Sequence, residues 1–270
     1  MRFLNCSVCL DVSAPNNYVM LDSQKILIDK AKSCKLAGFV SELEQQFSNP
    51  HIYNNMPFDE RLDKCFEAQK KYAKISRFKT LYRNSLIRYP IWTNQLNASQ
   101  ERGLTANHIE ILSQTDYIEK LLNVIITGPT GTGKSSLAIA AAMEAMDKGY
   151  SAKVYRLSDL LAKIDGLDDL AFIRFKESLR KIKVLVIDDY GLIKINDSQA
   201  VKLNEIADIR YMSGSTIITS QLMFKSLPEA IDPSPIRDAL ADRLFRHNDI
   251  YIELKGKSWR GSEQELKGNK

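Results

Sequence analysis

The glycine-rich stretch at residues 123–138, NVIITGPTGTGKSSLA, constrains the fold more than any other part of the sequence. Three apolar residues at 124–126 predict a buried strand, and the Ala-rich run after the glycines predicts a helix. Between them, Gly128, Gly133, Lys134 and Ser135 have the spacing G-x-x-x-x-G-K-[ST], which is typical of a phosphate-binding loop. A glycine-rich turn without a ligand is the alternative, and the flanking strand and helix disfavour it.

A triphosphate explains why these residue types are needed. Glycines let the backbone curl with its N–H groups inward, and the start of a helix adds the positive end of its dipole. Lys134 would contact the β- and γ-phosphates, and the Ser135 hydroxyl would bind Mg²⁺. We therefore predict ATP and Mg²⁺ as cofactors and the following ATP-binding residues: Gly128, Pro129, Thr130, Gly131, Thr132, Gly133, Lys134, Ser135 and Ser136.

Two carboxylates follow a second apolar run. Residues 184–187 predict a buried strand, and Asp188 and Asp189 come directly after it. Such a pair can be a turn or a helix cap, but downstream of a phosphate loop we expect Asp188 to bind Mg²⁺ and Asp189 to orient the attacking water. A third strand at 216–221 should lie beside the phosphate-loop strand and bring Gln221, or alternatively Thr219, towards the γ-phosphate.

Strands and helices alternate through this half of the chain, which predicts an α/β fold with a mostly parallel sheet of five strands. The expected helices cover 137–148, 158–164 with Ser158 as N-cap, and 170–181, and the remaining strands cover 152–157 and 250–254. A helical segment at 236–247 carries three candidates for a residue that stabilises phosphoryl charge: Arg237, Arg243 and Arg246.

The first ninety residues predict a separate helical region. Helical periodicity runs through 23–47, and the longest helical pattern starts at Phe58 and should end at Pro90. Between Lys70 and Arg88 there are seven basic residues and no acidic one, beside an apolar stripe formed by Ile75, Phe78, Tyr82, Leu86 and Tyr89. A solvated helix face is one interpretation, and contact with DNA is the other. The candidate DNA-binding residues are Lys70, Lys71, Lys74, Arg77 and Arg88.

Composition sets the remaining limits. A chain of 270 residues, 44% of them hydrophobic, can bury an α/β core and still form a second unit, and a net charge of +5 does not by itself require nucleic acid. Cys6 and Cys9 resemble half a zinc site without a second half, so we expect free thiols. With no long apolar run and no leader-like start, we expect a cytoplasmic protein, for which Met20 is an alternative first residue.

Several motifs in order resemble one family. GPTGTGKSSLAIA, VLVIDDYG, STIITSQL, ALADRLFRH and ELKGKSWR, preceded by PFDERLDKCFEAQ, are similar to the IstB-type helper ATPases of insertion-sequence transposition, which are relatives of the DnaC and DnaI helicase loaders. The resemblance implies an AAA+ ATPase without a large C-terminal lid. It implies these parts: an irregular extension (1–22), a helical domain (23–90), a linker with a lead-in helix (91–122), the ATPase domain (123–260) and a tail (261–270).

The resemblance also implies a function. Such proteins assemble as homo-oligomers on double-stranded DNA, with ATP sites between subunits, and deliver the DNA to a partner transposase. Carried over by position, Lys134 and Ser135 bind phosphate and Mg²⁺, Asp188 binds the metal, and Arg243 is the expected arginine finger, which acts on the ATP of a neighbouring subunit. Together with the residues predicted above, the expected catalytic set is Lys134, Asp188, Asp189, Gln221 and Arg243. Two departures stand out: Asp189 replaces a frequent Glu, which predicts slow hydrolysis, and Gln221 replaces a frequent Asn.

Two other functions stay open. A replicative helicase loader of the DnaC type would share the ATPase core and bind a helicase instead of a transposase. A small-metabolite kinase would be a monomer, would need a lid with convergent Arg residues and would ignore DNA.

Overall fold

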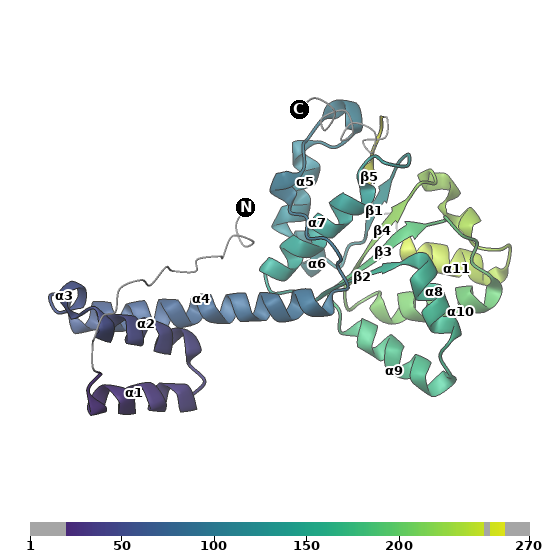
Figure 1. The fold of residues 1–270 in the computed structure, drawn as a ribbon. Coiled ribbons are helices and arrows are strands. Elements are labelled where there is room, and N and C mark those ends of the chain that lie inside the picture. The colour runs from purple at the N-terminus through teal and green to yellow at the C-terminus, as the bar shows by residue number, and fades with distance from the viewer. Residues whose placement is uncertain (1–19, 246–248, 257–270) are drawn as a thin grey trace, which may run out of the picture. The chain divides into compact units, whose positions relative to one another are not determined.

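The computed structural model describes residues 20–245 and 249–256. They form two compact units, which divide between Ser76 and Arg77 within one long helix. The first unit contains α1 (Asp22–Ser33), α2 (Ala37–Ser48), α3 (Pro50–Tyr53) and the first part of α4 (Phe58–Asn84) (Figure 1). The helical content predicted at 23–47 is thus confirmed, as two helices.

Close packing at Gly38 joins α2 to α4. A Cβ atom at this position would lie 2.5 Å from the Ala68 carbonyl oxygen, so only glycine permits the approach. The Gln69 side-chain oxygen accepts hydrogen bonds from the N–H groups of Gly38 and Phe39, at 2.9 and 3.2 Å. These bonds satisfy donors that the first turn of α2 leaves without a partner in the helix.

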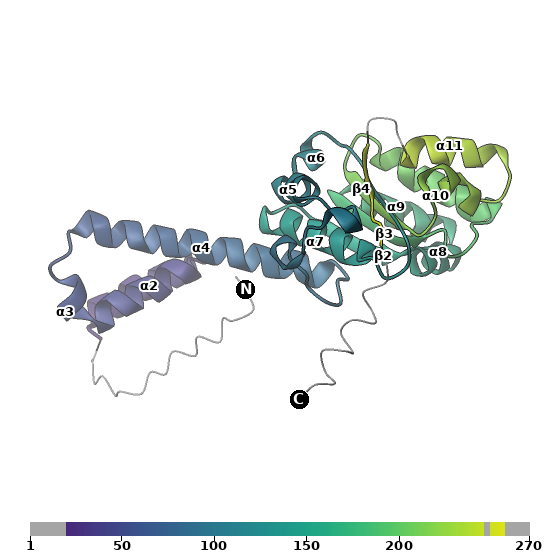
Figure 2. The same ribbon diagram turned by 90° about the horizontal axis from the view of Figure 1, so that it is seen from above.

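A parallel sheet forms the centre of the second unit. Its strands are β1 (Val124–Thr127), β2 (Ala152–Arg156), β3 (Val184–Tyr190), β4 (Ser215–Ser220) and β5 (Ile250–Glu253), in the order β2-β3-β4-β1-β5. Every neighbouring pair in this order is parallel, which confirms the predicted sheet of five strands. Figure 2 shows the same sheet from above, with helices on both of its faces.

Alternate residues of the strands pack into two hydrophobic layers. Ile125 and Ile218 belong to the layer formed with α8 (Leu157–Asp165), α9 (Asp169–Arg180), α10 (Asp197–Arg210) and α11 (Pro235–Leu244). Val124, Ile126 and Ile217 belong to the layer formed with α5 (Ala106–Gln114), α6 (Asp116–Glu119) and α7 (Lys134–Asp147). Three short 3₁₀ helices complete the unit: η1 (Thr93–Gln95), η2 (Gln100–Arg102) and η3 (Phe224–Ala230).

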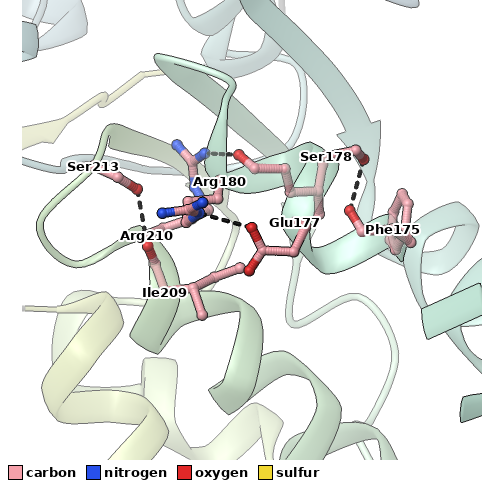
Figure 3. A network of polar contacts seen from close by, with 8 residues as sticks. Phe175, Glu177, Ser178, Arg180, Ile209, Arg210 and Ser213 are labelled. Atoms are coloured by element: carbon pink, nitrogen blue, oxygen red, sulfur yellow. Dashed lines mark hydrogen bonds and ion pairs between the residues drawn. The ribbon is translucent and has the colours of Figure 1, made fainter. Parts of the chain in front are cut away.

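A buried cation fixes the end of the sheet away from the phosphate loop. Arg210 is 2% exposed and donates hydrogen bonds of 2.6 to 2.7 Å to the carbonyl oxygens of Leu179, Ile182 and Ser215. Figure 3 shows the polar contacts around it, at the ends of α9 and α10. Burial lowers the pKa of Arg210 to about 10, and the three carbonyl dipoles compensate for the lost hydration of the guanidinium group.

Several predicted limits were wrong. Helix α4 ends at Asn84, well before Pro90, because Leu86 has a left-handed backbone (φ 64°) and the Ser85 carbonyl oxygen accepts a hydrogen bond from Val154 N–H of β2. Leu86, Arg88 and Tyr89 therefore do not continue its faces. Ser158 is not an N-cap, since α8 begins at Leu157 with Arg156 in the cap position.

Other predictions have no test among these residues. Cys6, Cys9, Arg246, the tail at 261–270 and most of the extension at 1–22 lie outside the part that the structure describes. The limits given for the linker and the two domains stay a prediction.

Candidate nucleotide-binding site

The phosphate loop connects β1 to α7 and has the backbone that the glycines predicted. Gly128, Gly131 and Gly133 have φ angles of 144°, 82° and 94°, which are strained for any residue with a Cβ atom. At Gly128 such an atom would also lie 2.3 Å from the Leu254 carbonyl oxygen. Gly133 is the N-cap of α7, so the loop lies at the positive end of a helix of 14 residues.

The lysine of the loop lies against the loop itself. Lys134 is 7% exposed, and its Nζ donates to the carbonyl oxygens of Gly128 and Pro129, both at 2.8 Å. The loop is braced further by Thr132, whose hydroxyl donates to the Pro129 carbonyl oxygen at 2.8 Å. The residues present therefore fit a polyphosphate: a glycine cradle, a helix N-terminus and a cation on one short segment.

Asp188 of β3 meets the end of the phosphate loop. Its Oδ1 accepts a hydrogen bond of 2.8 Å from the Ser135 hydroxyl and one of 2.5 Å from the Thr219 hydroxyl of β4. A serine hydroxyl and a carboxylate oxygen are ligands that Mg²⁺ takes in phosphate sites, where water and phosphate complete the coordination. The described residues contain no cluster of three or more His, Cys, Asp or Glu side chains that could hold a metal ion.

Asp189 has an unusual backbone. Its φ is 59°, and its N–H donates to the Thr219 hydroxyl oxygen at 3.0 Å. The pairing of β3 with β4 shifts register between Ile187 and Tyr190, around the two carboxylates. Strained residues of this kind gather at functional sites, where the surrounding structure holds them in place.

Gln221 follows β4 and reaches the phosphate loop. The Thr130 hydroxyl donates to its side-chain oxygen at 2.9 Å. Strand β4 pairs with β1, as predicted, so Gln221, Ser135 and Asp188 lie together at the carboxyl ends of the strands. The structure thus brings together the predicted residues of the loop and of the two neighbouring strands.

Arg243 lies at the other end of the sheet. Its Nε donates to Asp208 Oδ1 on α10 at 2.9 Å, and its carbonyl oxygen accepts a bond of 3.4 Å from the side chain of Asn123, which precedes β1. The structure therefore does not bring Arg243 to the phosphate loop of its own chain. Arg237 lies on the same helix, near Asp238.

The candidate DNA-binding residues are in different situations. Two of them, Lys70 and Lys71, are exposed on α4, and Lys74 lies one turn further along. The Lys70 ammonium forms an ion pair with Glu67 at 3.3 Å. Arg77 donates to the Gly149 carbonyl oxygen, just after α7, at 2.7 Å. Arg88 lies beyond the helix, so its predicted place on the basic face was wrong.

Two residues with contacts at this site escaped the sequence analysis. Arg102 donates to the Thr132 carbonyl oxygen within the phosphate loop, at 3.0 Å. Thr219 contacts Asp188 and Asp189, whereas the pattern suggested it only as an alternative contact for phosphate. Arg102 lies outside the quoted motifs, and Thr219 lies within STIITSQL, but only the order of strands and loops in space could have revealed these contacts.

Comparisons with known proteins agree with this geometry. A family model for the IstB-like ATP binding protein matches residues 29–267. The chain is 33% identical to the protein named as the ATP-binding protein of insertion sequence IS1162 from Pseudomonas fluorescens, over 70% of this chain and 82% of that one. It is 31% identical to the insertion sequence ATP-binding protein y4uH of Sinorhizobium fredii, over 85% of this chain and 92% of the relative.

Solved structures show the same fold at low identity. The crystal structure of DnaI has a TM-score of 0.52 at 18% identity, over 65% of this chain and 93% of that one. A DNA replication initiation factor has a TM-score of 0.51 at 16% identity, over 63% and 51% of the two chains. The predicted α/β phosphate-loop fold is thus confirmed.

Within residues 20–245 and 249–256, none of the helices combines the length and the apolar character that crossing a membrane requires. The family match covers both units, and the resemblance found in the motifs is confirmed. The chain belongs to the family of IstB-like ATP binding proteins.

Proposed function

We propose that this protein is an ATPase that assembles on double-stranded DNA and delivers it to, or regulates, a partner transposase. The contact between Ser135 and Asp188 at the end of the phosphate loop supports this proposal most directly, because a hydroxyl and a carboxylate at this place would suit Mg²⁺ bound with ATP. The names of the relatives, ATP-binding proteins of insertion sequences, support the link to transposition.

Each residue of the site has a role in ATP hydrolysis. Lys134 would exchange its loop carbonyls for the β- and γ-phosphates. Ser135 and Asp188 would hold Mg²⁺, which would supply charge neutralisation at the phosphates. Asp189 orients the water that attacks the γ-phosphorus as the bond to ADP breaks. Gln221 contacts the γ-phosphate. Because the side chain of Asp189 is short, turnover should be slow.

Arg243 suits action on a neighbouring subunit. It lies at the amino ends of the strands, whereas the phosphate loop lies at their carboxyl ends. A finger that completes the site of the next subunit would make ATP favour the assembled state and hydrolysis favour release, through the difference in affinity between the two states. With such a finger, the ATP sites would lie between subunits.

The basic residues of α4 would supply affinity for DNA. Lys70, Lys71 and Lys74 lie on a stretch of helix without acidic residues between Lys70 and Asn84. Lysines that neutralise phosphates release counterions, so binding would be independent of sequence and would fall with salt.

The deciding experiment measures ATP turnover and particle size, each with and without duplex DNA. We expect slow turnover that DNA stimulates, together with growth in particle size, and we expect Lys134→Ala to abolish ATP binding and assembly. A monomer with DNA-independent turnover would overturn the proposal and favour a metabolite kinase. Full nucleotide affinity and assembly in the Lys134→Ala variant would also contradict it.

A helicase loader of the DnaC type is the second candidate. The fold shared with DnaI favours it, although at 18% identity this likeness concerns the fold alone. The two functions differ in the partner, so binding of purified chain to a replicative helicase or to a transposase of the same element distinguishes them.

A further inference from the structure

Arg102 contacts the phosphate loop from outside the motif. It ends η2, thirty residues before Thr132, and its Nη2 donates to the Thr132 carbonyl oxygen at 3.0 Å. The same guanidinium lies against Gly133, where a Cβ atom would be 3.0 Å from Nη2. Position 133 thus favours glycine for two reasons: its φ is positive, and the Arg102 guanidinium lies against the place of a Cβ atom.

The segment that carries Arg102 is firmly placed. Ser99 and Leu104 exchange backbone hydrogen bonds of 2.8 and 3.2 Å, which close a short loop. The Arg102 carbonyl oxygen accepts a bond of 2.7 Å from Lys255 N–H, just after β5. At Gly103 a Cβ atom would lie 2.2 Å from the Glu253 carbonyl oxygen, so the loop packs directly on the end of β5. Strand β5 pairs with β1, and the guanidinium is therefore held at a fixed place relative to the phosphate loop.

The bond to Thr132 acts on the next N–H group. A peptide unit is planar and trans, so the carbonyl of Thr132 and the N–H of Gly133 point in opposite directions. A cation that holds the carbonyl outward turns the N–H inward, to the side on which a phosphate loop binds its anion. Without that cation the peptide could rotate, and the inward orientation would have to be selected when phosphate binds.

We propose that Arg102 is a positioning residue of the nucleotide site: through the Thr132 carbonyl it fixes the Gly133 N–H for a nucleoside di- or triphosphate. The inference rests on the proposed ATP binding and adds a residue that lies outside the phosphate-loop motif. We expect the effect on affinity, because the contact of Arg102 at this site is with the loop backbone at Thr132.

The test compares Arg102→Met, which keeps the apolar stem, with Arg102→Lys, which keeps one charged donor of similar reach. By titration with Mg–ATP and with ADP, we expect Met to weaken binding about tenfold and Lys to recover most of the loss. The KM for ATP should rise in parallel, with kcat unchanged. Arg180→Met, which removes an exposed arginine paired with Glu177 on α9, is the matched control and should bind as wild type does.

Thermal unfolding without nucleotide separates positioning from support of the fold. We expect Arg102→Met to have the same Tm as the wild-type chain without nucleotide, and a smaller rise in Tm when ATP is added. Wild-type affinity in Arg102→Met would overturn the inference, and so would a variant that is unfolded without nucleotide. ATP binding by Lys134→Ala is measured in the same experiment. If the wild-type chain does not bind ATP, the proposed function itself fails. If Lys134→Ala loses ATP binding while Arg102→Met keeps it, only the role of Arg102 is refuted.

Discussion

Thr219 connects the carboxylate of Asp188 to the backbone of Asp189 in β3. It is fully buried, donates to Asp188 and accepts from the Asp189 N–H, so one hydroxyl holds a side chain and a backbone together. Removal of this hydroxyl should release both, at a cost of about 1–2 kcal/mol in the free energy of unfolding. The larger effect should be on turnover, because the orientation of the carboxylates is lost.

We predict that Thr219→Val lowers kcat about tenfold or more while ATP affinity stays within about threefold of wild type. Thr219→Ser, which keeps the hydroxyl, should restore most of the turnover. Single-turnover hydrolysis and urea unfolding measure the two effects. A valine variant with wild-type kcat would show that the carboxylates do not depend on the hydroxyl.

The left-handed backbone of Asp189 gives a physical reason for the departure from glutamate. Asp and Asn occur at positive φ several times more often than other residues with side chains. A φ of 59° therefore suits Asp at this position better than Glu. The motif identified the residue, but its backbone depends on the register shift between β3 and β4, which no local pattern reports.

At the scale of elements, the second half of the chain was predicted well because its signals are local. Glycine spacing, apolar runs and their alternation with helices placed the five strands and the loop. The end of α4 was predicted wrongly, since Pro90 is an obvious stop signal and the actual end depends on Ser85 pairing with the edge strand β2. Contacts between distant segments decided that case.

The basic residues of α4 divide into two groups with different expected effects. Arg77→Ala should lower the free energy of unfolding by about 1 kcal/mol, because the guanidinium satisfies the Gly149 carbonyl oxygen after α7. Lys71→Ala should leave stability unchanged and weaken binding to duplex DNA, with the slope of log K against log salt reduced by about 1. Urea unfolding and salt-dependent gel shifts measure these quantities. An unchanged salt slope in Lys71→Ala would remove Lys71 from the DNA-binding surface.

At the scale of the molecule, two buried tyrosines should set the alkaline limit of stability. Tyr117 and Tyr190 are 1% exposed, and neither hydroxyl has a hydrogen-bond partner among the described residues. Burial raises the pKa of both phenols above the ordinary value of about 10. As the pH rises, these two phenols therefore ionise in the unfolded chain before they ionise in the folded one. The stability that the two tyrosines contribute is complete below pH 10 and declines as the pH rises above it.

We predict that the double variant Tyr117→Phe, Tyr190→Phe keeps more of its stability between pH 10 and 11 than wild type does. At pH 7 it should be about as stable as wild type, because no hydrogen bond is lost. Arg210, whose pKa burial lowers, is common to both chains and does not affect the difference between them. Urea unfolding across this range measures the difference, and identical alkaline profiles would contradict the prediction.

The position of β4 between β1 and β3 has a consequence for the order in which the protein is made. A nascent chain contains the phosphate loop and both carboxylates once residue 190 has emerged, yet the strand that joins them ends at Ser220. Until that strand inserts, Thr219 cannot link the acids and β1 has no neighbour on that side. Competence to bind nucleotide should therefore arise late in synthesis, as a single event, instead of growing as each motif leaves the ribosome.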